Sequence, residues 1–439
     1  MFEAYKKLLA EFVALQSVST DSAFLAEIKH AAQWLEKLFR DQGFRVTVLT
    51  DPDCNPIIVA HYDAGLAETL LVYGHYDVQP AEMEQGWNTD PFTLNEKSGR
   101  FFGRGATDNK GQILVHMVAA FETIRKNALR TNLTFIIEGN EETANPVLPG
   151  IIAKHTTLLR CDEILVSDGT LREDRPTIEA GCRGGYNLRI QLRTAPTDIH
   201  SGKGGGMVPS ATAALAHLLA GLTDKRGKVL IKDFYKDVPE VDSKIAALNA
   251  ELANHNDFAK QFGVKKLISA NQTDFYTQIG LYPTLQISGV QGGYTGSGFA
   301  NIIPATAEAR LNIRVVAGQD VGEHMDNVKQ ELQNRLPDYV EAVIETFEGH
   351  NGVSLDTETP SATRAAQILE EAYGSKVIYS YAGGSIPIVV DLKRILGVDP
   401  LLVSIGNADS NIHGANENLK ISLVEKALAF SYAYMSKDS

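Results

Sequence analysis

The chain has 439 residues, of which 44% are hydrophobic, and its 54 acidic against 41 basic residues give a formal net charge of -13. This length exceeds one ordinary hydrophobic core and indicates two compact domains. The acidic balance argues against nucleic acid or an anionic membrane as a partner, because both favour basic patches.

The first part of the chain has the pattern of an α/β domain. Helical patterns run from Glu3 to Leu15 and from Ser22 to Gln42, and Gly43 follows in the C-cap role. Short apolar runs rich in β-branched residues predict the strands RVTVLT, PIIVAHY, TLLVYGHYD, TNLTFIIEG and EILVSDG. NKGQILVHMVAAFETIRKN and PGIIAKHTTLL are typical of helices between them. In an open sheet of this kind, we expect functional residues just past the strand ends.

After Gly181 the pattern changes to that of an antiparallel α+β unit. GYNLRIQLRTA alternates polar and apolar residues, and PSATAALAHLLAGL is predicted to be a helix with Pro209 in its first turn. Residues 233–274 are polar and mostly helical in pattern. Further strands and one helix are predicted in TLQISGVQGG, EARLNIRVV, DVGEHMDNVKQELQNRL and YVEAVIETFEG.

The α/β pattern then resumes with a helix from Ser361 to Ala372 and the strands KVIYS and PLLVSIG. We therefore predict an α/β fold in which residues 1–182 and 353–439 form one domain, with a mixed sheet flanked by helices. Residues 183–352 are predicted to be an inserted α+β domain.

The cysteines and the N-terminal segment favour a reducing compartment. Cys54, Cys161 and Cys182 have no CxxC spacing, so they indicate neither a disulfide framework nor a structural zinc knuckle. Charged residues interrupt MFEAYKKLLAEFVALQSVST, and no apolar run approaches the ~20 residues that span a bilayer. We expect a cytoplasmic protein with no membrane partner.

The first two candidate sites have ordinary alternatives. In GHYDVQP, His75 follows a strand, and Asp77 two residues later can face the same way and fix the imidazole tautomer. A lone histidine there is more typical of a loop or core residue. In FGRGATDNKGQ, Asp108 precedes a helix, where an N-cap is the commoner role. That glycine-rich loop lacks the GxxxxGK[ST] spacing of a phosphate-binding loop.

The other candidates also follow apolar runs. EGNEETANP crowds Glu138, Glu141 and Glu142 together, and their repulsion requires a cation or a proton, although an acidic surface turn has the same composition. Asp168 follows EILVS, and a polar loop with a histidine follows LLVSIG. A carboxylate shared by two ions would hold them ~3.5 to 4 Å apart. The donor set that we expect for Zn²⁺ or Mn²⁺ is His75, Asp108, Glu142, Asp168 and His413.

The ordered series GHYDVQP, GRGATDNKG, EGNEE, VSDGT and HGANEN resembles the dinuclear metallopeptidase family that includes carnosinase-like dipeptidases, carboxypeptidase G and aminoacylases. RGGYNLRIQLRTAPTDIHSG, DFYKDV, NIIPATAEARLNIRVV and GGSIP resemble its dipeptidase branch. The resemblance covers nearly the whole chain. It implies that the inserted domain is a lid that also forms a homodimer. It also implies a metal-dependent hydrolase that cleaves the amide bond of dipeptides, with a metal-bridging water as the nucleophile.

The same resemblance distributes the five ligands between two ions. His75 and Asp168 would hold one ion, and Glu142 and His413 would hold the other. Asp108 would bridge both, and the peptide bond that follows it would be cis.

Further roles are implied only by the resemblance. Glu141 would be the general base, and Asp77 would orient the imidazole of the first ligand. His200, which alone is typical of a turn histidine, would reach the partner subunit's site and stabilise the oxyanion. Arg314 and Ser385 would bind the substrate carboxylate. Asn301, where some relatives have threonine, is a further candidate for substrate binding.

Two alternatives remain open. An N-acyl amino-acid deacylase or desuccinylase would use the same metal centre, although DFYKDV and GGSIP favour dipeptides. A non-catalytic metal-binding or peptide-binding relative is disfavoured by the retention of Glu141, because a binding module has no need of a proton shuttle. A nucleophilic hydrolase is disfavoured because the chain has no GxSxG motif.

Overall fold

The protein is described by a computed structural model that covers every residue except 144, 255, 348, 385–386 and 438–439. The described residues divide into two compact units. The first comprises Met1–Ala180, Leu355–Ser380 and Ile388–Ser439, and the second comprises Gly181–Ser354 and Tyr381–Pro387.

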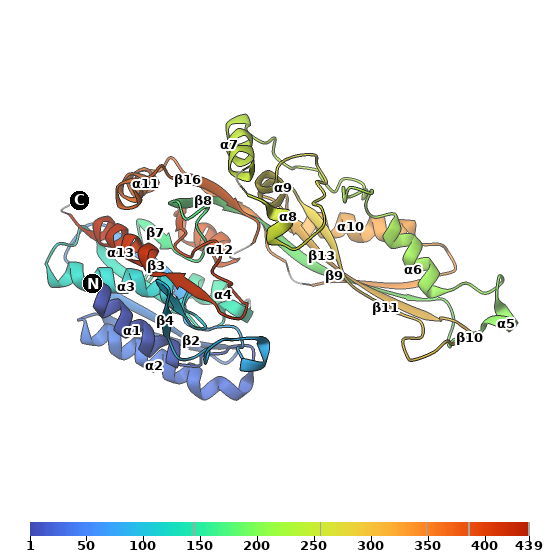
Figure 1. Ribbon diagram of the computed structural model, residues 1–439, viewed down its shortest axis with the longest axis horizontal. Helices are drawn as coiled ribbons and strands as arrows, with labels where there is room; N and C mark the ends of the chain where they lie inside the picture. The colour runs from blue at the N-terminus through green and yellow to red at the C-terminus, as the bar shows by residue number, and fades with distance from the viewer. Residues whose placement is uncertain (144, 255, 348, 385–386, 438–439) are drawn as a thin grey trace. The chain divides into compact units, whose positions relative to one another are not determined.

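A mixed sheet forms the centre of the first unit (Figure 1). Its strands follow the order β1-β2-β6-β3-β7-β17-β8. β3 is parallel to β6 and β7, and β7 is parallel to β17, whereas the other neighbours in this order are antiparallel. The mixed sheet confirms the predicted fold class. The strands are β1 (Arg45–Asp51), β2 (Cys54–Tyr62), β3 (Thr69–His75), β6 (Asn132–Glu138), β7 (Glu163–Val166), β8 (Thr177–Cys182) and β17 (Pro400–Val403).

Helices pack against this sheet and form the hydrophobic core with it. α2 packs on β1 and β2, α3 packs on β3, and α1 and α13 pack on α3. β6 is buried along its whole length, which explains its continuous apolar sequence. The helices are α1 (Phe2–Ala14), α2 (Leu25–Asp41), α3 (Lys110–Arg125), α4 (Leu148–Lys154), α11 (Pro360–Tyr373), α12 (Pro387–Leu396) and α13 (Ile421–Met435). No helix in the described part of the chain has both the length and the apolar character to cross a membrane.

α3 is buried on nearly every side, and its polar residues are satisfied inside the core. His116 contacts the hydroxyl groups of Ser431 and Ser167 at 2.9 and 2.8 Å. The Lys110 ammonium donates to the carbonyl oxygens of Phe12 and Leu15 at 2.9 and 2.5 Å. These bonds fix the start and the middle of α3 against α1, β7 and α13.

The second unit contains an antiparallel sheet in the order β11-β13-β9-β14. Its two central strands, β13 and β9, alternate buried residues with more exposed ones, because α6 and α10 cover one face and bury the apolar half. The main elements are β9 (Gly184–Arg193), β11 (Thr284–Gly292), β13 (Thr306–Val315), β14 (Glu341–Thr346), α6 (Ala211–Ala220), α7 (Ser243–Asn254), α8 (Phe258–Gln261), α9 (Phe275–Leu281) and α10 (Val321–Arg335).

Short elements complete the chain. β4, β5 and β18 form a small sheet, β10 pairs with β12, and β15 and β16 pair with β8. The bounds are β4 (Asn95–Lys97), β5 (Arg100–Phe102), β10 (Ile199–His200), α5 (Ser201–Gly204), β12 (Ile302–Ile303), β15 (Val353–Ser354), β16 (Ile378–Ala382) and β18 (Asn418–Lys420), with single helical turns η1 (Ser22–Phe24), η2 (Met83–Gln85) and η3 (Glu141–Thr143).

Two predicted helix starts were wrong. The helix that contains Ala211 begins after Pro209, because the Ser210 side chain caps it by accepting a hydrogen bond from the backbone N–H of Ala213. The pattern from Ser22 begins as the separate turn η1 before α2.

Candidate metal centre

Three parallel strands bring candidate ligands to one edge of the sheet. β3 ends at His75, and its register places His75 opposite Glu138, the last residue of β6. The turn η3 (Glu141–Thr143) follows β6, and Asp168 follows β7 by two residues. Because parallel strands end at the same edge, the sheet itself collects these side chains.

Asp108 and His413 reach this edge from loops. The loop before α3 is compact: Gly105 has a φ of 85°, and a Cβ on Gly111 would lie 1.8 Å from the Ala106 carbonyl oxygen. Only glycine fits at such an approach, so Gly111 in the first turn of α3 lets the loop that presents Asp108 lie close against the helix. His413 lies between β17 and β18 and has a φ of 62°.

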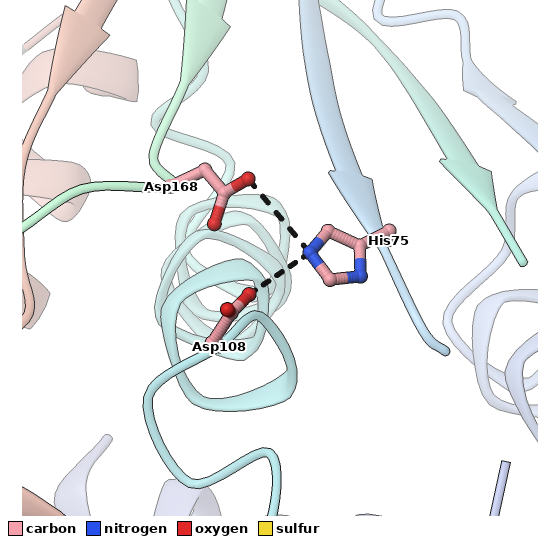
Figure 2. A group of neighbouring side chains, drawn as sticks. All are labelled: His75, Asp108 and Asp168. Atoms are coloured by element: carbon pink, nitrogen blue, oxygen red, sulfur yellow. Dashed lines mark hydrogen bonds and ion pairs between the residues drawn. The ribbon is translucent and has the colours of Figure 1, made fainter. Parts of the chain in front are cut away.

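The first donor group consists of His75, Asp108 and Asp168. Figure 2 shows His75 at the end of β3 facing the carboxylates of both aspartates. Its Nε2 lies 3.1 Å from Asp108 Oδ1 and 3.7 Å from Asp168 Oδ2. The candidate ligand atoms all lie within 4.8 Å of one another, which is compatible with a single cation.

The second donor group consists of Asp108, Glu142 and His413. His413 Nε2 lies 3.0 Å from Asp108 Oδ2 and 3.0 Å from Glu142 Oε2. Asp108 therefore directs one carboxylate oxygen to each group. This shared carboxylate is the feature expected of two neighbouring ions.

Asp108 does not cap α3. The N-cap is Asn109, which forms no side-chain cap bond, and the Asp108–Asn109 peptide bond is cis, as the resemblance implied. The Asn109 amide donates instead to the Ser167 carbonyl oxygen and to Asp168 Oδ1, at 2.7 and 3.0 Å. The backbone N–H of His75 donates to Asn109 Oδ1 at 3.3 Å. Asn109 thus joins the three segments of the first donor group.

Asp77 contacts both the segment that carries His75 and the turn that carries Glu141 and Glu142. Its Oδ1 is 3.3 Å from His75 Nδ1, and its backbone carbonyl oxygen is 3.0 Å from the same nitrogen. Its carboxylate also accepts the backbone N–H groups of Glu141 and Glu142, each at 3.2 Å, and the hydroxyl of Ser19 at 2.6 Å. Asp77 can therefore hold the imidazole and the glutamate turn in one arrangement.

The surrounding carboxylates favour protonated histidines. Burial opposes a charge on His75, but the adjacent Asp108, Asp168 and Asp77 outweigh it and raise the pKa of the imidazole well above its ordinary value. Asp108 and Glu142 raise the pKa of the half-exposed His413 to about 10. These raised pKa values show how strongly the site favours positive charge.

The carboxylates themselves compete for that charge. Burial raises the pKa of Glu141 well above its ordinary value; His75 opposes the increase, and Asp168 and Asp108 add to it. Burial, reinforced by Asp108, also raises the pKa of Asp168. Burial would raise the pKa of Asp108 too, but His413 and His75 hold it below its usual range.

Nitrogen and oxygen donors of this kind suit Zn²⁺ and Mn²⁺. The raised pKa values of Glu141 and Asp168 reflect the cost of gathering carboxylates in a buried space. A divalent cation offsets that cost without a proton. The residues present therefore fit divalent metal ions.

The other candidates lie in the second unit. His200 is exposed at the end of β10, and its Nδ1 accepts the N–H of Gly202 at 3.0 Å. The backbone of Asn301 accepts the N–H of Ser201 at 2.9 Å. Arg314 lies on β13, and burial lowers the pKa of its guanidinium. Ser385 lies outside the described residues.

Two residues near the donor groups were not identified from sequence. Gln79 donates to Glu142 Oε2 at 2.7 Å, and Glu417 accepts the backbone N–H of Asp108 at 2.9 Å. Both lie inside the quoted segments GHYDVQP and HGANEN. A carboxylate four residues after a candidate histidine ligand was the available signal.

The chain matches the model of peptidase family M20/M25/M40 over residues 71–437. The Cys-Gly metallodipeptidase DUG1 of Candida albicans is 29% identical over 446 residues, which cover 94% of this chain and 90% of the relative. The Beta-Ala-His dipeptidase of Homo sapiens is 29% identical over 382 residues, with coverage of 83% and 74%. Among solved structures, the M20 family metallo-carboxypeptidase Sso-CP2 from Sulfolobus solfataricus is 27% identical with a TM-score of 0.86, and the alignment covers 98% of both chains.

Proposed function

The chain belongs to peptidase family M20/M25/M40, which confirms the resemblance seen in its motifs, and we propose that it hydrolyses the peptide bond of dipeptides. The two curated relatives described above are named dipeptidases. The observation that carries the proposal is the Asp108 carboxylate, which faces one donor group with each oxygen. Glu141 beside this carboxylate adds a group that can move protons.

In this proposal the two donor groups hold two divalent ions, Zn²⁺ or Mn²⁺. His75 and Asp168 would hold one ion, Glu142 and His413 would hold the other, and Asp108 would serve both. Bound ions of this kind supply Lewis acidity, which polarises a carbonyl group and acidifies water. Asp77 keeps the Nδ1 of His75 hydrogen bonded, so Nε2 remains free to act as the ligand atom.

Glu141 acts as the general base. Its Oε2 lies 3.9 Å from His75 Nε2, so it stands at the rim of the first donor group. Burial raises the pKa of its carboxyl well above its ordinary value, and a carboxyl group in this position can take and return a proton. Glu141 takes the proton of the attacking water and passes it to the leaving amine.

Residues of the second unit recognise the substrate. The charge and partial burial of Arg314 suit a substrate carboxylate, and Asn301 and Ser385 are the further candidates. We propose that the protein is a homodimer in which His200 reaches the site of the other subunit and stabilises the oxyanion.

A substrate panel tests the proposal. Metal-free protein is reloaded with Zn²⁺ or Mn²⁺ and assayed on dipeptides, tripeptides and N-acyl amino acids. We expect dipeptides to give the highest kcat/KM. Tripeptides hydrolysed as fast as dipeptides would favour a carboxypeptidase, the activity of the similar protein Sso-CP2. A preference for N-acyl amino acids would favour a deacylase, and binding of dipeptides without hydrolysis would favour a non-catalytic protein.

The cross-subunit role of His200 has a separate test. Glu141→Gln and His200→Ala are each expected to be nearly inactive. In a mixed dimer, the His200→Ala subunit keeps its own Glu141 and receives His200 of the partner subunit. Mixing the two variants should therefore recover activity, whereas a histidine that acts within its own subunit would give none.

A further inference from the structure

Glu417 is a fully buried carboxylate that holds the backbone of the Asp108 loop. Its Oε1 accepts the N–H groups of Thr107 and Asp108 at 2.8 and 2.9 Å. Its Oε2 accepts the N–H of Gly105 at 3.0 Å. One side chain thus fixes three peptide groups in the segment that presents the shared carboxylate.

Arg104 extends this contact to neighbouring loops. It forms a buried ion pair with Glu417, with 2.6 Å between Nη1 and Oε2. Its Nη2 makes longer contacts of 3.4 Å with the carbonyl oxygens of Pro80 and Gly414. Pro80 follows Gln79, which donates to Glu142, and Gly414 follows His413. The pair therefore contacts the backbone at Asp108, the backbone next to His413, and the backbone next to Gln79, whose side chain donates to Glu142.

General stability does not explain such a pair well. Removing two charges from water is costly, and well-packed apolar residues often give an equally stable core. What an ion pair supplies and an apolar pair lacks is direction, because each Glu417 oxygen accepts from defined N–H groups. Here the hydrogen bonds to Glu417 fix the orientation of the peptide group whose N–H belongs to Asp108.

We propose that the Glu417–Arg104 pair is the positioning element of the metal centre, and that it sets the orientation in which Asp108 can serve both ions. Neither residue touches substrate or metal in this role. The inference rests on the proposed two-ion centre and adds the residues on which its geometry depends.

The test is metal binding by Glu417→Gln. Each Glu417 oxygen accepts two hydrogen bonds. In either orientation of the glutamine amide, its NH₂ group replaces one of these oxygens and faces two N–H donors, so at least two hydrogen bonds are lost. Loss of a residue that orients a ligand commonly weakens metal affinity by about 10- to 100-fold. We expect a fall of this size for at least one ion when Zn²⁺ is titrated calorimetrically into the metal-free full chain.

Glu163→Gln is the matched control. Glu163 is also an almost buried carboxylate, and Arg130 and Arg364 bind it at 2.7 and 2.8 Å. It lies at the start of β7, whereas Asp168 lies beyond the other end of that strand. Glu163→Gln should lower the melting temperature of the metal-free protein but leave zinc affinity at the wild-type value.

A second variant covers the case in which Glu417→Gln does not fold. Glu417→Gln leaves the Arg104 guanidinium buried without its carboxylate, so the double variant Arg104→Met/Glu417→Gln removes that charge as well. The double variant should have a higher melting temperature than Glu417→Gln but keep the weakened zinc affinity. If Glu417→Gln does not fold, the zinc affinity of the double variant tests the inference.

The inference would be overturned if Glu417→Gln or the double variant folds and binds both zinc ions with wild-type affinity. It would also be overturned if Glu163→Gln loses as much zinc affinity as Glu417→Gln. Those results would leave the proposed function standing. A wild-type protein that binds no divalent ion would instead refute the proposed metal centre.

Discussion

Metal binding should displace a proton from His413. In the metal-free protein, Asp108 and Glu142 raise the pKa of His413 to about 10, so the imidazole is protonated at pH 8. A histidine must be neutral to bind a metal. The ion that uses His413 therefore releases one proton there, and its affinity rises about tenfold per pH unit up to about pH 10, or ~1.4 kcal/mol per unit. Above that pH the dependence from this residue disappears.

His413→Gln isolates this proton. The amide does not titrate, so the number of protons released at pH 8 should fall by about one relative to wild type. The assay is calorimetric titration of Zn²⁺ into metal-free protein, in buffers that differ in ionisation enthalpy. Equal proton release by the two proteins would refute the assignment of His413 as a ligand with a raised pKa.

The same shift predicts a change in the folding stability of the metal-free protein. A raised pKa in the folded state stabilises the fold fully below about pH 6.5 and loses that effect as the pH rises toward about 10. Because the His413 side chain is 52% exposed, we expect only about 0 to 1 kcal/mol, as for surface ion pairs. The melting temperatures of the metal-free wild type and His413→Gln should therefore differ more at pH 6 than at pH 10.

Four further results are expected. Glu141→Gln should keep both ions but lose about 10²- to 10⁴-fold in kcat, and near-wild-type turnover would exclude it as the base. Asp77→Asn should weaken zinc affinity about 10- to 100-fold, measured by competition with a chelating dye; an unchanged affinity would limit Asp77 to a structural role. His200→Ala should lower kcat/KM without changing metal content, because His200 belongs to neither donor group; loss of metal in that variant would contradict the assignment. Chelation should lower the melting temperature and abolish hydrolysis, and Zn²⁺ or Mn²⁺ should restore both; full activity in chelator would refute metal dependence.

Much of the first unit could be predicted because its strands are short and continuously apolar. TLLVY and LTFII became the buried strands β3 and β6, and their parallel pairing explains why His75 and the glutamate turn converge. The alternation in β9 likewise predicted a sheet with one covered face. In each case, local sequence reports the burial that the fold imposes.

Other features depend on contacts that local sequence does not contain. An aspartate before a helix more commonly caps it, and the role of Asp108 is distinguished only by the approach of His75 and His413 and by the N-cap position of Asn109. Glu417 acts on a backbone N–H 309 residues earlier in the chain. The role proposed for His200 would depend on a second subunit, and the charge and spacing of its own segment do not indicate one.

The shared position of Asp108 has a consequence for protein synthesis. The first donor group is complete once Asp168 has been made, whereas His413 follows 413 − 168 = 245 residues later. At ribosomal rates of about 5 to 20 residues per second, this interval lasts roughly 12 to 50 s. Throughout it, the nascent chain has His75 and the three acidic candidate ligands but not the histidine of the second group. On the proposed assignment, the chain could not complete the two-ion centre before His413 is made, so hydrolysis would start only after the second unit has been synthesised.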